Sequence, residues 1–357
     1  MRRAETVDVL VVGLGPAGSR AAQAAAGKGA RVVAIDRRRK AGYPVQCAEF
    51  VPALLAHEIT GLPRVTRQRI RAMMTFVEDE TPDIEPRFPG AIIDREAFDA
   101  ALAAQAAAAG AQCRFGVGLA VLAEDGTAHL TDGTTVRSRA VIGADGPRSC
   151  VGRAVGRINR ELLETRQATV PLFALHEATD IFLGADIPGG YAWLFPKGAV
   201  ANLGVGVEPE AKARLRPLLE DLHRELARAG RVGDDVLGLT GGPIPVGGML
   251  HPVAFREGVP VLLAGDAAGL TNPVTGAGIA AAVISGSLAG EAAADWLAGK
   301  SAALDGYIEE LEALFGEALR RALDRRRELG RRYADGQGPT PADLRRGWIA
   351  YGDYWAA

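Results

Sequence analysis

The sequence has few cysteines and no apolar run long enough to cross a bilayer. Its three cysteines are odd in number and widely spaced, which excludes a disulfide framework and a Cys-x-x-Cys metal site. The five histidines are scattered and form no metal cluster, so we expect no metal. The longest apolar segment, 277–290, is too short to span a membrane, and the N-terminus is a poor signal peptide. We therefore expect a cytoplasmic protein, either soluble or bound peripherally to a membrane.

A strong net charge is also lacking. The formal charge of −2 gives no overall electrostatic argument for a nucleic-acid partner, and we expect none. With 357 residues, 48% of them hydrophobic, the chain can form one large or two ordinary domains with substantial cores.

The chain does contain a β-α-β pattern at its beginning. The segment VDVLVV at 7–12 is typical of a buried parallel strand, and a glycine turn, an alanine-rich helix and a second strand, RVVAIDRR, follow it. Further on, the sequence predicts a helix over 95–110 and short strands over 119–142, joined by Asp-Gly turns. After residue 255 the pattern returns, with a strand and a helix from about 276 to 298.

These patterns predict an α/β fold in which a Rossmann-like dinucleotide-binding domain is discontinuous. We assign residues 1–60, 90–155 and 255–300 to that domain. Residues 61–89 and 156–254, rich in Pro, Gly and aromatic residues, form an inserted antiparallel-sheet substrate domain. Residues 301–357 form a C-terminal helical region.

The first chemical motif is GLGPAG at 13–18, between the first strand and the first helix. Its first glycine permits a tight turn, its second lets a pyrophosphate approach the backbone, and its third lets the helix pack on the strand. The helix N-terminus offers free N–H groups to phosphates. Asp36, at the end of the second strand, suits the two hydroxyls of an adenosine ribose and would repel a 2′-phosphate.

Three later motifs indicate which dinucleotide is bound. The segments GADGPRS at 143–149, AGDAA at 264–268 and IDREAFD at 93–99 resemble signatures of the hydroxylase-type flavoproteins. This resemblance implies FAD, with Asp266 on the ribityl chain and the helix after Gly276 and Gly278 aimed at the pyrimidine edge of the flavin. The expected cofactor-binding residues are Gly13, Gly15, Pro16, Ala17, Gly18, Asp36, Arg37, Cys47, Ala48, Arg95, Asp145, Gly146, Gly265, Asp266, Gly276, Ala277, Gly278 and Ile279.

The middle of the chain carries a narrower signal. YAWLFP at 191–196, then seven residues and Gly-Val-Gly at 204–206, resembles the pattern of the geranylgeranyl reductases, flavoenzymes that saturate double bonds of isoprenoid chains. Strand alternation puts Tyr191, Trp193 and Phe195 on one face, where they would bind an apolar substrate. An ordinary aromatic core strand has the same alternation, but the Gly-x-Gly extension and the flavin motifs favour the resemblance.

The segment PVQCAE at 44–49 resembles a segment of the same family whose cysteine lies close to the flavin ring. That family usually has a glycine soon after the cysteine, whereas here Ala48 and Glu49 follow it. Two interpretations of Cys47 stay open, a catalytic proton donor or a small hydrophobic side chain packed on the ring. Glu49 and His57 could also titrate, but their spacing fixes no role.

The resemblance implies an FAD-dependent reductase of isoprenoid double bonds. The alternatives are an FAD-dependent monooxygenase that hydroxylates or epoxidises an apolar or aromatic substrate, or a halogenase. A non-redox flavoprotein similar to carotenoid cyclases and a pure binding module are further alternatives. The electron donor stays open between NAD(P)H and a ferredoxin partner, because no second GxGxxG occurs in a β-α-β setting.

An Arg-rich stretch at 319–336 allows two interpretations. It could contact anionic lipid, which would suit an enzyme acting on membrane isoprenoids. More often, such a stretch is a solvated helix face whose arginines pair with nearby Glu and whose leucines face the core.

Overall fold

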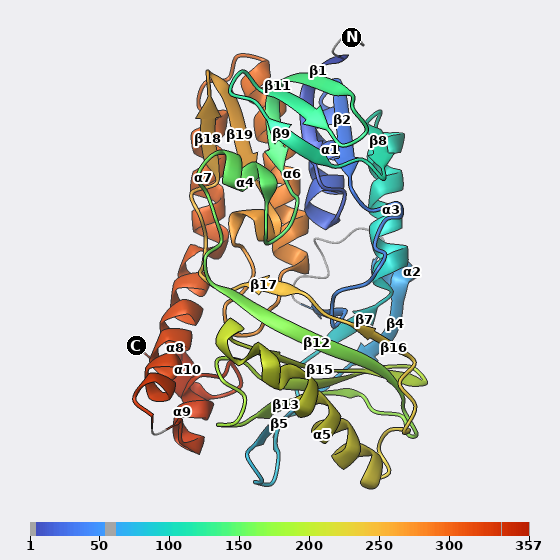
Figure 1. The fold of residues 1–357 in the computed structure, drawn as a ribbon, viewed down its shortest axis with the longest axis vertical. Coiled ribbons are helices and arrows are strands. Elements are labelled where there is room, and N and C mark those ends of the chain that lie inside the picture. The colour runs from blue at the N-terminus through green and yellow to red at the C-terminus, as the bar shows by residue number, and fades with distance from the viewer. Residues whose placement is uncertain (1–4, 54–61, 337, 357) are drawn as a thin grey trace.

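The computed structural model describes residues 5–53, 62–336 and 338–356. Figure 1 shows two β-sheet regions, one at each end of an elongated molecule, with C-terminal helices along one side. This arrangement confirms the α/β class with a discontinuous Rossmann-like unit. The expected domain boundary between residues 60 and 61 lies outside the described residues. The division into domains stays a prediction.

The first sheet has eight strands and a parallel centre. Its main order is β18-β19-β11-β1-β2-β8, and β10 and β9 extend it from β11. β1 pairs in parallel with both β2 and β11, as in a β-α-β fold. The strands are β1 (Glu5–Val12), β2 (Val32–Asp36), β8 (Gln112–Phe115), β9 (Leu119–Leu122), β10 (Thr127–Leu130), β11 (Thr135–Gly143), β18 (Val253–Arg256) and β19 (Val259–Leu263).

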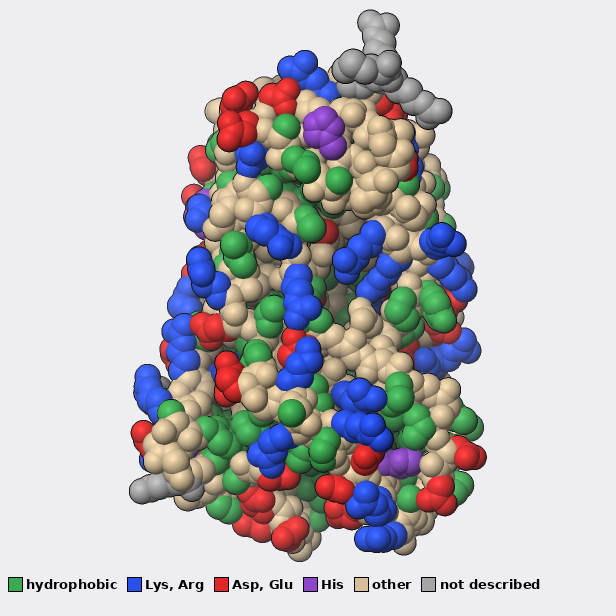
Figure 2. All heavy atoms as spheres, in the orientation of Figure 1, with side chains coloured by type: hydrophobic (Ala, Val, Ile, Leu, Met, Phe, Trp, Pro, Cys, Tyr) green, Lys and Arg blue, Asp and Glu red, His purple; other side chains and the backbone are tan. Residues whose placement is uncertain are grey.

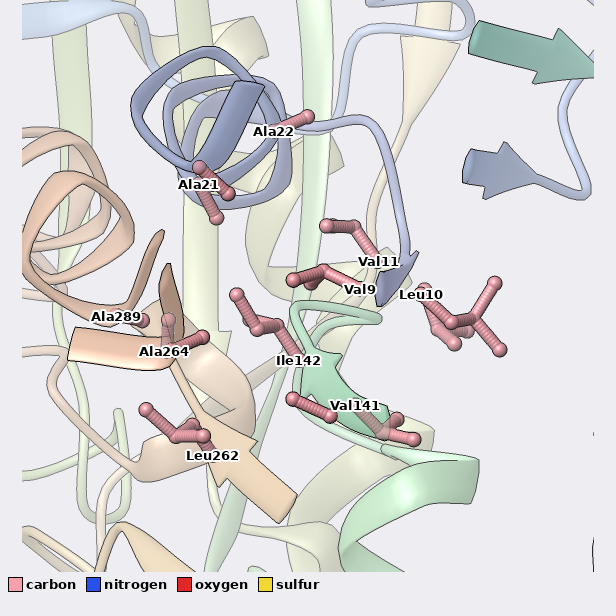
Figure 3. Packing of buried hydrophobic residues seen from close by; sticks show 14 of the residues in the cluster. Val9, Leu10, Val11, Ala21, Ala22, Val141, Ile142, Leu262, Ala264 and Ala289 are labelled. Atoms are coloured by element: carbon pink, nitrogen blue, oxygen red, sulfur yellow. The ribbon is translucent and has the colours of Figure 1, made fainter. Parts of the chain in front are cut away.

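Helices α1 (Pro16–Gly27), α3 (Arg95–Ala108) and α6 (Ile279–Leu297) accompany this sheet. Buried alanines of α1 and α6 pack on fully buried strand residues, as Figure 3 shows for Ala21 and Ala289 around Val9 and Ile142. Small residues also bring α1 and α6 together: a Cβ at Gly286 would lie 2.1 Å from the Ala17 carbonyl oxygen, and one at Gly290 would lie 2.3 Å from that of Ala21. These contacts advance along both helices in the same direction, so the two N-termini point to the same end of the sheet.

The second sheet runs in the order β16-β12-β15-β14-β13-β5-β6, with β17 also on β12. It is antiparallel, as expected, with one exception: β13 pairs in parallel with β5. No hairpin joins these two strands, because the chain returns to the first sheet between them. The strands are β5 (Ala72–Val77), β6 (Asp83–Glu85), β12 (Leu162–Pro171), β13 (Ala178–Leu183), β14 (Ala192–Lys197), β15 (Val200–Val207), β16 (Gly238–Thr240) and β17 (Pro243–Pro245).

Helix α5 (Leu215–Arg228) covers one face of the second sheet, where Leu194 and Leu203 are fully buried beneath it. The opposite face of the sheet is turned toward the first sheet. A small third sheet, β3 (Phe50–Pro52), β7 (Gly90–Ile93) and β4 (Thr66–Ile70), joins the two regions beside α2 (Leu62–Val65).

The remaining helices are α4 (Cys150–Ala154), α7 (Ala303–Leu311), α8 (Glu317–Ala334), α9 (Pro341–Arg346) and α10 (Gly352–Trp355). Two 3₁₀ turns, η2 (Pro209–Arg214) and η3 (Gly265–Ala268), and the π-helical turn η4 (Glu312–Gly316) also occur in the described part of the chain. Within the described part of the chain, no helix has the length and hydropathy that a membrane crossing requires. Leu344 of α9 and Trp348, just after it, belong to the same buried cluster as Trp193 of the second sheet, so the chain folds back onto that sheet here.

The Arg-rich stretch forms most of α8, and its charges are largely paired. Arg320, Arg321 and Arg332 bind the carboxylates of Glu312, Glu317 and Asp343. Its leucines face the protein: Leu319 is buried, and Leu329 packs against the cluster around Trp348. This arrangement matches the solvated-face interpretation and leaves α8 without an apolar face toward solvent.

Candidate active site

A cavity of about 910 Å³ lies between the two large sheets. Its wall on one side consists of the strand ends and helix N-termini of the first sheet, and on the other side of the open face of the second sheet. This volume is near the upper limit for small-molecule sites, so the cavity can take a large cofactor together with part of a substrate. All the cofactor-binding and substrate-binding residues expected from the sequence line it, except Gly18 and Gly265.

The glycine turn at 13–18 forms one end of the cavity. Gly13 has φ of +99°, and a Cβ there would lie 2.2 Å from the carbonyl oxygen of Ala144. A Cβ on Gly18 would lie 1.7 Å from the carbonyl oxygen of Gly13, so this glycine lets α1 pack on the turn. Gly15 differs, because a Cβ there would meet no protein atom within 4 Å. Gly15 is the N-cap of α1 and lines the cavity, so its bare backbone faces space in which a phosphate fits.

Asp36 ends β2 beside this turn. Its carboxylate accepts hydrogen bonds from the backbone N–H of Leu14, at 2.8 Å, and of Arg38, at 2.7 Å. These two bonds fix the carboxylate at the cavity wall, next to Arg37. A carboxylate has about four acceptor positions, so two remain for the hydroxyl groups of a ribose.

Asp145 is placed at the cavity but is already satisfied by the protein. Its carboxylate accepts from the hydroxyl of Ser149 and from the backbone N–H of Cys150 and Val151, at the start of α4. Burial raises the pKa of Asp145, and these hydrogen bonds act in the opposite direction. Asp145 therefore holds the loop, and Gly146 beside it lines the cavity.

Asp266 lies in η3, shortly after β19, and its half-buried side chain lines the cavity. Burial raises the pKa of Asp266, while a 2.7 Å hydrogen bond from the Thr271 hydroxyl and the charge of Arg95 lower it. One hydroxyl donor leaves most of the carboxylate's acceptor positions open, and donors on a bound molecule would satisfy them.

The start of α6 forms the wall next to Asp266. The helix begins at Ile279, three residues later than the sequence predicted, because Gly276 has φ of +69° and Gly278 is the N-cap. No side chain caps this end, and residues 276–279 line the cavity. The N-terminus of α6 therefore presents unpaired N–H groups and its positive dipole end to whatever occupies the cavity.

Cys47 lies where the two halves of the cavity meet. Its Sγ accepts a 3.2 Å hydrogen bond from the backbone N–H of Glu49. Arg95 lies beside the same sulfur and forms two 3.1 Å hydrogen bonds to Asp99. Burial lowers the pKa of Arg95, but Asp99 and Cys47 raise it and give a net upward shift, so the guanidinium stays charged.

Tyr191, Trp193 and Phe195 lie on the cavity face of the second sheet, as the strand alternation predicted. Trp193 sits opposite Gly204, where a Cβ would lie 2.2 Å from the indole Cζ2 atom. The first glycine of the Gly-Val-Gly segment thus makes room for the indole ring. Tyr191 donates a 2.6 Å hydrogen bond to the carbonyl of Thr275, which ties this strand to the loop before α6.

The sequence analysis missed much of the apolar wall on this side. The missed residues come from β5, β13, the 85–90 loop and the C-terminal segment: Met73, Phe88, Ile181, Trp348 and Ile349. Trp348 packs on Tyr191 with ring centroids 4.8 Å apart and is only 3% exposed. None of these segments carries a motif. Their apolar alternation could have indicated burial, but no local sequence pattern indicates that these segments contact one another.

Other candidate groups lie away from this cavity. His176 contacts Asp180 on the α5 side of the second sheet, and His251 and His223 contact backbone carbonyls. In residues 5–53, 62–336 and 338–356, no three His, Cys, Asp or Glu side chains gather as metal ligands. His57 lies outside the described residues.

Comparison with known proteins decides the family. A family model described as the geranylgeranyl reductase catalytic domain matches residues 166–233, and one described as lycopene cyclase protein matches residues 8–162. The digeranylgeranylglycerophospholipid reductase of Methanosarcina mazei is 34% identical over 307 residues, which are 80% of this chain and 74% of that protein. The chain belongs to the geranylgeranyl reductase family.

Solved structures agree with this family. A geranylgeranyl bacteriochlorophyll reductase-like protein from Thermoplasma acidophilum superimposes with a TM-score of 0.83 at 27% identity, covering 92% of this chain and 88% of that one. A probable FAD-dependent monooxygenase from Pseudomonas aeruginosa superimposes with a TM-score of 0.71 at 20% identity, covering 93% and 98%. The second likeness shows a shared fold only. The chain is therefore an oxidoreductase with a fold that flavoproteins use.

Proposed function

We propose that this enzyme binds FAD and reduces carbon–carbon double bonds of an isoprenoid chain carried by a lipid. The observation that carries the proposal is that the aromatic face of β14 and the glycine turn at 13–18 line one continuous cavity. The names of the similar reductases support an isoprenoid lipid as the substrate. The family-model match to lycopene cyclases ends at residue 162, before β14 and its aromatic residues, whereas the match to the geranylgeranyl reductase catalytic domain includes them.

The residues present fit FAD. The open backbone at Gly15 would hold the pyrophosphate, Asp36 the adenosine ribose and Asp266 the ribityl hydroxyls. The uncapped N-terminus of α6 would face the pyrimidine edge of the flavin, where a positive dipole end favours negative charge. When bound and reduced, FAD supplies a hydride to an alkene carbon.

The side chains of the second sheet bind and orient the substrate chain. Tyr191, Trp193 and Phe195 offer a dry surface along which a prenyl group gains by leaving water. An unactivated alkene is a poor hydride acceptor, so holding the double bond in one position must contribute much of the rate.

Cys47 is our candidate catalytic residue for the second hydrogen. Its Sγ would donate a proton to the other alkene carbon from the junction of the two cavity halves. The Glu49 N–H and the Arg95 guanidinium beside this sulfur would then stabilise the thiolate that remains.

For the electron donor, NAD(P)H and an acidic ferredoxin both suit the face shown in Figure 2, where Lys and Arg side chains spread across the middle of the molecule. Arg37, Arg38 and Arg148 line the cavity, and the Arg148 side chain is 60% exposed. If the enzyme meets its substrate at a membrane surface, α8 contributes charge but no apolar anchor.

The test is product analysis with a chemical reductant. FAD-loaded protein is incubated under anaerobic dithionite with a geranylgeranyl phospholipid, and the extracted lipid is examined by mass spectrometry. The proposal requires a gain of two hydrogen atoms per reduced double bond, and a strong loss of that product in Trp193→Leu. Unchanged lipid without oxygen, and a product one oxygen atom heavier when air and NADPH are supplied, would instead establish a monooxygenase.

A further inference from the structure

Glu49 has an unusual position for a glutamate. It follows Cys47 by two residues, is 2% exposed, and has φ of +69°, a left-handed backbone conformation that favours glycine. A charged side chain in a buried, left-handed position requires strong compensating contacts. The contacts around its carboxylate supply them.

The Glu49 carboxylate is bound by three donors from three elements. One oxygen accepts from the backbone N–H of Arg95, at 3.0 Å, at the N-terminus of α3. The other accepts from Lys197 Nζ, at 2.6 Å, and from Asn202 Nδ2, at 2.9 Å. Lys197 ends β14 and Asn202 lies on β15, so one carboxylate joins the first-sheet region to the second sheet.

The backbone of the same turn is tied to the second sheet as well. Gln167 of β12 donates a 3.1 Å hydrogen bond to the carbonyl of Cys47, and its own amide oxygen accepts from the indole N–H of Trp193, at 3.0 Å. Asn202 also donates to the carbonyl of Ala48, at 3.4 Å. The turn that carries the Cys47 sulfur is therefore held by β12 and β15 as well as by Lys197 at the end of β14, the strand that carries the aromatic residues.

We infer that Glu49 is a positioning residue: its ion pair with Lys197 fixes the Cys47 turn against β14 and β15 and so sets where the Cys47 sulfur stands relative to Trp193. This inference rests on the proposed function for its effect on turnover. The Glu49 N–H that bonds the sulfur belongs to the same residue, so displacement of the carboxylate also disturbs the donor on Cys47.

The first arm of the test measures Cys47 without using the reaction. In FAD-loaded protein carrying Cys113→Ala and Cys150→Ala, Cys47 is the one remaining cysteine, and iodoacetamide alkylation is followed by mass. Glu49→Gln should speed alkylation by about tenfold, because the turn opens more often. Lys197→Met should act in the same direction while it keeps the carboxylate, and it carries the test if Glu49→Gln does not fold.

The control is Glu317→Gln, which removes an exposed ion pair with Arg321 on α8 and should leave alkylation unchanged. Thermal melts of all variants show whether the effect is local. An alkylation rate within twofold of the parent in every folded variant of the pair Glu49→Gln and Lys197→Met would overturn the inference. The turn would then not depend on the ion pair.

The second arm separates positioning from binding. With a geranylgeranyl phospholipid, the Glu49→Gln variant should lose about tenfold in kcat while KM stays within threefold, and Glu49→Asp should recover part of the loss. A tenfold rise in KM with an unchanged kcat would contradict a positioning role. If the parent protein does not reduce the lipid at all, the proposed function fails. The alkylation experiment still shows whether the Glu49–Lys197 ion pair holds the Cys47 turn.

Discussion

The two halves of the cavity are built by different means. On the first-sheet side the wall is mostly backbone: the glycine turn at 13–18, the uncapped N-termini of α1 and α6, and a few carboxylates fixed by N–H or hydroxyl donors. On the second-sheet side it is mostly large side chains from β5, β13 and β14 and from the segment after α9. A cofactor with fixed phosphates and hydroxyls suits the first wall, whereas a variable apolar chain suits the second.

Because of this difference, single substitutions can change protein stability, FAD affinity or substrate binding separately. In the backbone wall, a single methyl group either collides with the protein or enters space reserved for the ligand. In the wall made of side chains, a methyl group added at Gly204 would instead displace the indole ring of Trp193.

The largest effect is expected for Gly18→Ala. Its Cβ would meet the Gly13 carbonyl oxygen at 1.7 Å, which forces α1 off the turn and should cost at least about 3 kcal/mol of unfolding free energy. Urea unfolding of flavin-free protein measures this. Gly27→Ala in the same helix, where the Cβ meets nothing within 4 Å, is the matched control and should cost nothing. Equal stability of the two variants would contradict the close packing of α1.

The next largest effect is expected for Gly15→Ala, and it should fall on the cofactor alone. The added Cβ meets no protein atom within 4 Å, so the flavin-free protein should keep its stability. FAD affinity, measured by quenching of flavin fluorescence, should fall at least about tenfold, because the methyl group occupies the phosphate cradle. Undiminished FAD affinity would show that the phosphates lie elsewhere.

A smaller effect is expected for Gly204→Ala, on the other wall. Its Cβ would displace the indole of Trp193, at a cost of about 1–3 kcal/mol in stability. KM for the isoprenoid lipid should rise while FAD affinity stays within twofold. A second substitution, Trp193→Phe, removes the clashing atoms and should restore most of the stability. If Gly204→Ala weakens FAD binding as much as lipid binding, the two walls do not act separately.

The smallest effect is expected for Asp266→Asn, and its sign differs between free and loaded protein. Burial raises the pKa of Asp266, so the ionised carboxyl costs stability as the pH rises above the unfolded value of about 3.9. The flavin-free Asn variant should therefore melt slightly above wild type at pH 7, and the gap should narrow as the pH falls toward 4. FAD binding should weaken. A lower melting temperature at pH 7 without flavin would contradict the burial cost.

The same contrast explains what the sequence could predict. The glycine turn, Asp36, Asp266 and the start of α6 each follow a strand within one short segment, so local patterns and a family resemblance indicate them. The aromatic face of β14 was also predictable, because strand alternation is local.

The rest depends on contacts between distant segments. The parallel pairing of β5 with β13 joins strands about 100 residues apart. Trp348 reaches Tyr191 and the aromatic wall only because the chain folds back after α9. Glu49 looked like a departure from the family pattern, and its partners Lys197 and Asn202 are about 150 residues away.

The central claim is that the cofactor and an isoprenoid chain meet in this one cavity, and anaerobic stopped-flow absorbance tests it most directly. Photoreduced FAD-loaded protein is mixed with a geranylgeranyl phospholipid in the absence of oxygen, with Trp193→Leu beside it. The account predicts that the lipid reoxidises the flavin, and does so much more slowly in Trp193→Leu. A flavin that stays reduced until oxygen enters, in both proteins, would contradict it.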